Sequence, residues 1–390
     1  MNVCMIAYTF YEEDNRVRRY AEALAKRGDR VDAIALQRGG LPVHEVLRGV
    51  NVYRIQPRVR NEKGKSSYLS RLLKFLVNSA LFLSKKHIAS KYDLVHVHSV
   101  PDFEVFAALL PKLTGAKIIL DIHDIVPEFY ASKFHVETAS LVYKALVLLE
   151  RLSICFSDHV IISNHLWEQK LVARSVRREK CSTYLNYPDP AIFRRPTGSL
   201  RGDRKFLIMY PGSLNWHQGL DIAVKAFAVA SGELVNAEFH IYGAGPEENS
   251  LRTLVTDLGL EGRILFKGSL PLDDISSAMA KASVGVVPKR NDNFGGEAFS
   301  TKIFEFMSVG VPVILSRTKI DDYYFNDSVV QFFEPENYRD LAKSLIYLAK
   351  NEDARQRLVS NAMEFVGDFC WDKKICEYFG LIRNMRTERR

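Results

Sequence analysis

Short apolar segments alternate with amphipathic segments along the chain. NVCMIAYTF at residues 2–10 precedes a stretch closed by Gly28, and RVDAIAL at residues 30–36 follows it. Inside that stretch, apolar side chains recur three and four positions apart, at Val17, Tyr20, Ala21, Leu24 and Ala25. Short apolar runs are typical of buried strands, and the wider spacing is typical of a helix that packs on them. The pattern predicts a strand–helix–strand unit.

The same rhythm continues through the first half of the chain. Further apolar runs are DLVHVHS, AKIILDIH and DHVIIS, and the stretches at 103–113 and 138–155 lie between them with helical patterns. Strands joined by helices run parallel, and such a sheet is covered on both faces. Residues 1–190 are therefore predicted to form a Rossmann-like domain.

A second series of the same kind follows a break. Residues 187–204 are rich in Pro, Gly and charge, which predicts a linker. The later apolar runs are KFLIMYPGS, AEFHIYGAG, RILFKGS and VGVVP, separated by predicted helices at 219–231, 247–259 and 273–282. We expect an α/β chain with two doubly wound Rossmann-like domains, the second at 205–370, whose strand ends face a central cleft.

The tail of the chain reads as helical from residue 337. Its last helix, at residues 371–390, carries Trp371, Tyr378 and Phe379, which are suited to anchor it. This helix could cross back to the N-terminal domain.

Composition favours an intracellular globular protein. The chain has 390 residues, of which 47% are hydrophobic, and its five cysteines are scattered without a C-x-x-C pair. Neither a disulfide framework nor a cysteine zinc site is expected, and a reducing cytoplasm fits. The first residues show no basic segment of a secretory signal, and no apolar run reaches the roughly 20 residues needed to cross a bilayer.

The net charge of +8 is concentrated in one segment. Residues 58–91 contain nine Lys and Arg against the single Glu62, so the rest of the chain is close to neutral. Within this segment, LLKFLVNSALFL is apolar with basic flanks, as in helices that lie on an anionic membrane. A core helix with a solvated basic end explains the pattern equally well. Nucleic acid is not an expected partner, because the basic residues have few aromatic neighbours for stacking.

The stretch GGEAFSTKIFEFMSVGVPVIL, at residues 295–315, predicts a helix that starts at a ligand. Ser300 and Thr301 are good caps, and Gly310 with Pro312 ends the helix. Free N–H groups and the positive end of the helix dipole suit a phosphate. Lys302 in the first turn has the wrong sign for the dipole, so an anionic ligand explains it better.

Two carboxylates accompany this helix start. Glu297 precedes it and Glu305 lies one turn inside it, where both could accept hydrogen bonds from the hydroxyls of a sugar or ribose. A sugar nucleotide fits the arrangement. A chance pairing is the alternative, because the chain has 46 acidic residues.

The same stretch resembles the signature of a large family of retaining glycosyltransferases with the GT-B fold, family 4, in which two Glu bracket seven residues before Gly-x-Pro. YPGSLNWHQGLD resembles the family's first donor loop, IYGAGPEENSL its Gly-x-Gly-Pro turn, and ILFKGSLPLDDI its base-binding segment. DIHDIVPE and SDHVIISN resemble landmarks of the N-terminal domain. These segments span nearly the whole chain in the family's order.

The resemblance implies roles for individual residues. Glu297 would contact the donor sugar, Glu305 the ribose, and the helix start the diphosphate, while His123 would act in catalysis beside the sugar. No protein-bound metal and no other cofactor is implied. The residues placed in donor binding are Gly212, Ser213, Gln218, Gly243, Gly245, Phe266, Thr301, Lys302, Ile303 and Glu305.

Two departures from the family pattern bear on anion binding. The first donor loop commonly carries an Arg and a Lys for the diphosphate, where this chain has Ser213 and Gln218. Lys302, with Lys289 or Arg290, could replace them.

The second departure is the loop YTFYEEDNRVRR, which is not Gly-rich. We expect Asn15, or else Asp14, to cap the following helix. Arg16 and Asp124 are candidates for contacts with an acceptor or a phosphate.

Two further histidines alternate along one predicted strand. His96 and His98 would make a zinc pair only with a third ligand, and the sequence indicates none. A structural role is preferred for His96, and no metal site is expected.

The leading hypothesis is a cytoplasmic retaining hexosyltransferase that builds a surface polysaccharide. Its donor would carry UDP or GDP, which the sequence does not separate, and its acceptor would be a saccharide, lipid-linked at the inner face of the plasma membrane. STKIFEFM and NWHQG look most like exopolysaccharide and capsule enzymes of bacteria. The alternatives are a sugar-nucleotide epimerase or a catalytically silent GT-B module that scaffolds polysaccharide assembly.

Overall fold

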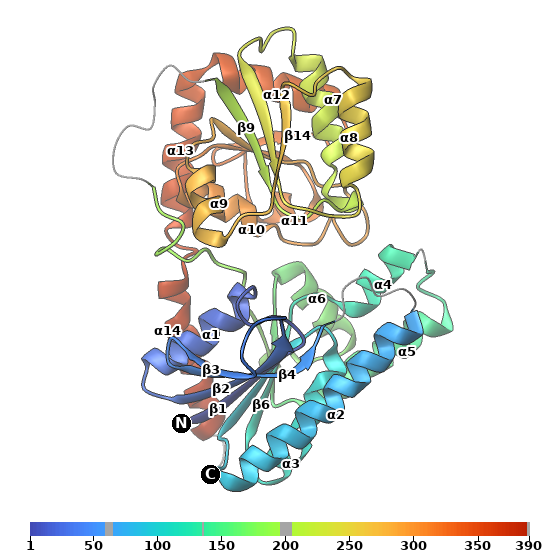
Figure 1. Ribbon diagram of the computed structural model, residues 1–390, viewed down its shortest axis with the longest axis vertical. Helices are drawn as coiled ribbons and strands as arrows, with labels where there is room; N and C mark the ends of the chain where they lie inside the picture. Colours follow the sequence, from blue (N-terminus) through green and yellow to red (C-terminus); the bar gives the residue numbers. More distant parts are fainter. Residues whose placement is uncertain (59–64, 135, 196–204, 388–390) are drawn as a thin grey trace. The chain divides into compact units, whose positions relative to one another are not determined.

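The computed structural model describes residues 1–58, 65–134, 136–195 and 205–387, and it folds into two compact units (Figure 1). The first unit comprises Met1–Asn186 and Ile375–Arg390, and the second comprises Tyr187–Lys374. The expected linker at 187–204 lies partly outside the described residues. Each unit is built on its own sheet with helices against it, and each has its own core.

The first unit contains an eight-stranded sheet with the order β3-β4-β2-β1-β5-β6-β7-β8. All neighbours pair parallel except β3 and β4, which form an antiparallel edge. The strands are β1 (Asn2–Ala7), β2 (Arg30–Gln37), β3 (His44–Leu47), β4 (Val50–Pro57), β5 (Leu94–Ser99), β6 (Lys117–Ile122), β7 (His159–Ile162) and β8 (Cys181–Thr183). The strands β5 and β7 are wholly buried and β1 is buried except at Asn2, because helices cover both faces of a parallel sheet.

Helices of the first unit follow the strands. They are α1 (Asn15–Lys26), α2 (Lys65–Ala89), η1 (Asp102–Ala108), α3 (Leu109–Leu113), α4 (Val126–Phe134), α5 (Leu141–Phe156), α6 (His165–Arg174) and η2 (Arg178–Lys180). The helix expected at 103–113 opens as the 3-10 helix η1. The final helix, α14 (Trp371–Thr387), contributes Tyr378 to this unit, where the side chain is fully buried.

The cap of α1 differs from the preferred expectation. Asp14 accepts hydrogen bonds from the backbone N–H groups of Arg16 and Val17, so Asn15 is the first helical residue and not the cap. A carboxylate satisfies these two amides and also complements the helix dipole, which an amide side chain does less well.

The second unit contains a six-stranded sheet, every pair parallel, with the order β11-β10-β9-β12-β13-β14. Its strands are β9 (Phe206–Pro211), β10 (Ala237–Tyr242), β11 (Ile264–Gly268), β12 (Val284–Val287), β13 (Val313–Ser316) and β14 (Gln331–Phe333). Its helices are η3 (Trp216–Gln218), α7 (Leu220–Ala230), α8 (Glu248–Asp257), α9 (Leu272–Met279), α10 (Thr301–Ser308), α11 (Lys319–Tyr324), α12 (Tyr338–Lys350) and α13 (Glu352–Val366). The predicted α/β class with two Rossmann-like domains is confirmed.

Candidate active site

Loops at the carboxyl edge of the second sheet meet backbone to backbone. The N–H of Gly212, after β9, donates to the carbonyl of Tyr242 at 2.9 Å, and the N–H of Gly243, after β10, donates to the carbonyl of Gly268 at 2.8 Å. Both glycines have positive φ, 142° and 123°. A Cβ at Gly243 would stand 1.8 Å from the carbonyl oxygen of Gly212. Only glycine allows these loops to approach so closely.

A pocket of about 450 Å³ opens between these loops and the start of α10. The loop residues in its lining include Pro211, Tyr242, Ala244, Ser269 and Leu270. Six residues that the sequence placed in donor binding also line it, namely Gly212, Ser213, Gly243, Thr301, Lys302 and Glu305. The pocket therefore joins amide groups, hydroxyls, one ammonium and one carboxylate, a set suited to an anion that also carries hydroxyl groups.

Lys302 supplies the positive charge of this pocket. Its Nζ donates to Oε1 of Gln218 at 3.1 Å and lies 5.2 Å from the ring centre of Tyr210. Burial lowers the pKa of Lys302 to about 8, although Glu305 opposes that shift. A Cβ at Gly212 would stand 2.5 Å from Cε of Lys302, so glycine at that position makes room for the lysine. Gln218, in place of the family's lysine, holds Lys302 at the pocket.

The other two candidate cations, Lys289 and Arg290, form ion pairs with carboxylates outside the pocket lining. Lys289 is buried, pairs with Asp321 at 2.8 Å and donates to the carbonyl of Ala298 at 2.9 Å. Arg290 pairs with Asp221 at 2.7 Å, and its guanidinium lies 4.6 Å from the ring centre of Trp216. Neither side chain lines the pocket around Lys302, and the expectation that one of them joins Lys302 at the diphosphate stays a prediction.

Five more predicted site residues do not line the pocket, namely Glu297, Ile303, Gly245, Phe266 and Gln218, the last of which contacts Lys302 from outside the lining. Glu297 is 8% exposed and forms an ion pair with Lys319 at 2.9 Å. The side chain of Ile303 is fully buried, and its N–H donates to the carbonyl of Ser300 at 3.3 Å. Gly245 packs on the backbone of Leu214, which a Cβ would approach to 2.4 Å.

Phe266 is the fourth of these residues. It packs against the apolar core of the second unit, with the guanidinium of Arg252 4.4 Å from its ring centre. The structure gives it a packing role, and Ser269 and Leu270 of the same segment line the pocket instead.

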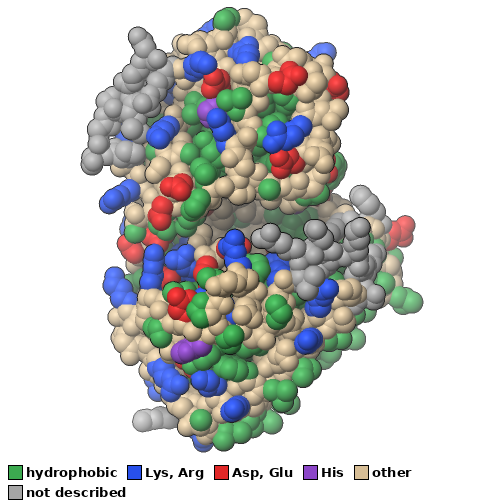
Figure 2. Space-filling model, in the orientation of Figure 1, with side chains coloured by type: hydrophobic (Ala, Val, Ile, Leu, Met, Phe, Trp, Pro, Cys, Tyr) green, Lys and Arg blue, Asp and Glu red, His purple; other side chains and the backbone are tan. Residues whose placement is uncertain are grey.

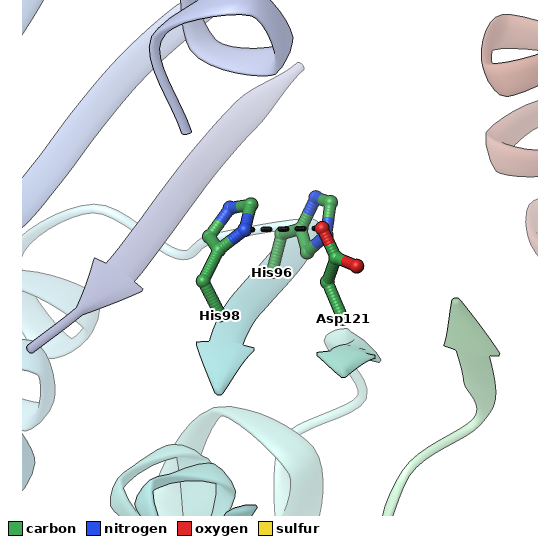
Figure 3. A group of neighbouring side chains, drawn as sticks. All are labelled: His96, His98 and Asp121. Atoms are coloured by element: carbon green, nitrogen blue, oxygen red, sulfur yellow. Dashed lines mark ion pairs between the residues drawn. The ribbon is translucent and has the colours of Figure 1, made fainter. Parts of the chain in front are cut away.

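A buried cluster of polar side chains occupies the strand ends of the first unit. His96 and His98 come from β5, and Asp121 comes from β6; Figure 3 shows their polar ends turned toward one another. Arg16 of α1 donates to both carboxylate oxygens of Asp121, at 2.7 and 2.8 Å. Burial opposes ionisation, but Arg16 and the neighbouring His123 hold the pKa of Asp121 well below its usual range. Arg16 is itself buried, so its expected contact with an acceptor or phosphate is corrected to an internal ion pair.

Asp121 also supplies the third possible metal-binding group beside His96 and His98, which the sequence analysis did not find. One donor atom each from His96, His98 and Asp121 lie within 4.8 Å of one another. However, the two imidazole rings stack at 4.2 Å with an angle of 21° between them. A metal ion must lie near the plane of each ring that binds it, and stacked rings share no such point. Arg16 already neutralises the carboxylate, so these residues fit a hydrogen-bonded network better than a metal centre.

His123 ends this network at the protein surface. Its side chain is 21% exposed, and its Nε2 lies 3.3 Å from Nδ1 of His98 and 3.5 Å from Oδ2 of Asp121. Its carbonyl accepts a hydrogen bond from Ser163 at 2.7 Å. The next residue, Asp124, is partly buried, and burial raises the pKa of its carboxyl. Asp121 lies in β6 two positions before His123, and this D-x-H spacing is the signal that could have pointed to Asp121 in the sequence.

Solved structures share this fold, and one of them contains a nucleotide. Sucrose-phosphate synthase from Thermosynechococcus elongatus superposes with a TM-score of 0.80 at 17% identity, over 99% of each chain. HepE from Anabaena, in a complex with UDP and glucose, superposes with a TM-score of 0.72 at 17% identity, over 97% of this chain and 99% of that one.

Family models match both units. The model for a glycosyl transferase 4-like domain matches residues 14–185, and the model for glycosyl transferases group 1 matches residues 195–365. The chain is a GT-B glycosyltransferase. A relative named as an uncharacterised glycosyltransferase of Methanocaldococcus jannaschii is 25% identical to this glycosyltransferase, over 90% of this chain and 89% of its own. In this glycosyltransferase the group 1 match includes the whole pocket around Lys302.

Proposed function

We propose that this glycosyltransferase moves a hexose from a nucleotide-sugar donor to a saccharide acceptor, with retention of configuration, in the synthesis of a surface polysaccharide. The observation that carries the proposal is the pocket in which Lys302, Thr301 and Glu305 meet the glycine loops. The complex of HepE with UDP and glucose supports the choice of donor class. Donor binding is assigned to the second unit and sugar-side chemistry to His123 of the first.

The pocket residues suggest how the leaving group is stabilised. Departure of the nucleotide leaves negative charge on the diphosphate, and preorganised donors stabilise such charge. The Lys302 ammonium and the N–H groups at the start of α10 supply them. Glu305, as an acceptor-only group, would bind the ribose hydroxyls. The departing phosphate oxygen would help to deprotonate the acceptor on the same face of the sugar, which gives retention.

Nucleotide binding tests this proposal directly. Calorimetric titration of the full chain with UDP, GDP, ADP and dTDP should show binding of one of them. Glu305→Ala should weaken that binding by roughly 1.5–3 kcal/mol, as expected for hydrogen bonds to a charged group. Glu261→Ala removes an exposed carboxylate of the same unit and serves as the matched control.

The outcomes separate the proposal from its rival. The catalytically silent module draws support from the missing cations at Ser213 and Gln218, and it predicts no turnover of any donor. If no nucleotide binds to the wild-type chain, the result favours the catalytically silent module over the transferase. If Glu305→Ala binds as well as wild type, the pocket is not the donor site.

We further propose that the first unit docks on an anionic membrane, where a lipid-linked acceptor would be found. One stripe of α2 is exposed and apolar, with side chains from 46% to 76% exposed, whereas Leu72, Phe75 and Leu83 on its other side are buried. The stripe consists of Leu69, Leu73, Val77, Leu81 and Ile88. The helix thus buries one apolar face on the core and exposes a second one. It therefore has features of both helices predicted for this segment, the core helix and the membrane-surface helix.

Neighbouring helices also expose apolar side chains. Leu109 and Leu113 of α3 and Leu141, Leu148 and Leu152 of α5 are also exposed. Both α2 and α5 pack on η1, and Figure 2 shows hydrophobic side chains gathered along this side of the first unit. Lys74 and Lys85 of α2 are exposed beside the stripe. No helix in the described part of the chain is long and apolar enough to span a bilayer, so attachment would be peripheral.

Sedimentation with vesicles tests the membrane proposal. The wild-type chain should sediment with vesicles of phosphatidylglycerol and phosphatidylcholine at low salt and less with phosphatidylcholine alone, since basic residues near an anionic surface add about 1 kcal/mol each. Leu81→Ser with Ile88→Ser should release it, because each buried side chain contributes roughly 1.5–3 kcal/mol. Val235→Ser, which changes an exposed apolar residue of the second unit, is the control. Wild-type protein that stays in the supernatant at low salt would refute the proposal.

A further inference from the structure

The ion pair between Arg16 and Asp121 lies deep in the first unit, where an ion pair adds little net stability. The side chains are 4% and 0% exposed. Removing two charges from water costs several kcal/mol per ion, and a well-packed apolar pair of similar size is often as stable. The remaining N–H groups of Arg16 donate to the carbonyl of Tyr184 at 2.7 Å and to Oδ1 of Asn186 at 3.0 Å. The guanidinium is thus held in place, and it fixes the carboxylate in turn.

The carboxylate faces two imidazoles as well as the guanidinium. Oδ2 of Asp121 lies 3.2 Å from Nδ1 of His98 and 3.5 Å from Nε2 of His123. His98 is locked by its stacking on His96, whose Nδ1 lies 2.8 Å from the hydroxyl of Tyr378. Of these three rings only that of His123 is more than marginally exposed.

We propose that Asp121 is a positioning residue that sets the ring orientation and the tautomer of His123. A carboxylate can only accept, so the nitrogens that face it carry the protons. His123 would then be protonated at Nε2, which leaves its Nδ1 as the acceptor of the ring. A ring held in this state can accept a hydrogen bond from a sugar hydroxyl without first reorienting. The catalytic consequence rests on the role proposed above for His123.

A purely structural role is the competing explanation. The cluster joins α1, β5, β6 and α14, so any change in it could lower stability without touching the chemistry. The two roles differ in one respect. Loss of packing affects every variant of the cluster, whereas loss of positioning affects only the members that face His123.

Asp121→Asn tests the proposal in the full-length chain. The amide can donate where the carboxylate accepted, so it should favour the opposite tautomer of His123. We expect kcat for sugar transfer to fall on the order of 100-fold, as for loss of a correctly placed acid–base group, while the donor KM stays within about twofold. Nitrogen-15 NMR of the histidine-labelled chain should show the His123 proton moving from Nε2 to Nδ1, with the signal assigned by its loss in His123→Gln.

Tyr378→Phe is the matched control, because it removes the hydroxyl that contacts His96 on the far side of the cluster. It should leave kcat and the His123 signal unchanged even if the melting temperature falls. If Asp121→Asn does not fold, the wild-type chain still tests the proposal, because the proton of its His123 ring should lie on Nε2, which faces the carboxylate.

Either of two results would overturn the proposal. One is a His123 proton on Nδ1 in the wild-type chain or an unchanged tautomer in a folded Asp121→Asn chain, and the other is an equal loss of kcat in Tyr378→Phe. The NMR measurement needs no turnover. A chain without transferase activity but with the tautomer shift would therefore contradict the proposed function and support the positioning network.

Discussion

Gly243→Ala should abolish measurable nucleotide binding. The new Cβ would lie 1.8 Å from the carbonyl oxygen of Gly212, and φ of 123° is strained for any residue with a side chain. Backbone surrounds this position, so the loops after β9 and β10 must separate. A displacement of about 1 Å in a positioning element can cost on the order of 100-fold. Calorimetric titration with the nucleotide that binds the wild-type chain measures the loss.

A second glycine of the same unit controls for the substitution itself. A Cβ at Gly232 would meet no atom within 4 Å, so Gly232→Ala should bind nucleotide normally. Thermal unfolding of both variants shows whether Gly243→Ala still folds. A folded Gly243→Ala chain with wild-type affinity would contradict the close approach of the two loops.

Lys302→Ala should weaken nucleotide binding by roughly 1.5–3 kcal/mol, the range for hydrogen bonds to a charged group. Lys302 is the cation in the lining of the pocket, and the candidates Lys289 and Arg290 are paired with carboxylates. Lys343→Ala removes an exposed charge from α12 and should leave binding unchanged. Equal affinities for Lys302→Ala and wild type would show that the diphosphate does not use this ammonium.

The affinity should also depend on pH in a defined direction. The phosphate binds the protonated lysine, and the pKa of Lys302 in the free chain is about 8. Affinity should therefore be full below pH 8 and fall by up to about tenfold per pH unit above it, until the raised pKa of the complex is reached. Lys302→Arg should remove this decline, since arginine stays protonated throughout. A flat profile for the wild-type chain between pH 7 and 9.5 would contradict this account.

Local patterns predicted some elements well and others poorly. Buried parallel strands such as β5 and β9 are continuous apolar runs, which explains their recognition from sequence. The β3–β4 edge was missed, because two of the alternate buried positions of β4 carry the polar side chains Arg54 and Gln56, and β3 has no fully buried residue. The eleven-residue stretch at 103–113 has a helical pattern, yet it begins as a 3-10 turn that buries Asp102 and Glu104.

The placement of residues at the pocket was predictable where one loop or helix start determines it. Gly212, Gly243, Thr301, Lys302 and Glu305 were all identified from short motifs, and the fold brings all five to one pocket. Parallel strands end at a common edge, so motifs placed directly after those strands must come together.

Partners distant in the chain were decided by the tertiary structure alone. Arg16 pairs with Asp121, 105 positions away in the sequence, and Arg290 pairs with Asp221, 69 positions away. A sequence shows that a cation exists but not whether an acidic group will neutralise it, because that depends on which elements pack together. The sequence by itself thus determined the class of fold through hydrophobic periodicity, and it pointed to the pocket motifs through the helix start at Thr301 and the resemblance to a glycosyltransferase family. Which charges remain available for a ligand, and which bury themselves in pairs, was decided when the sheets and helices assembled.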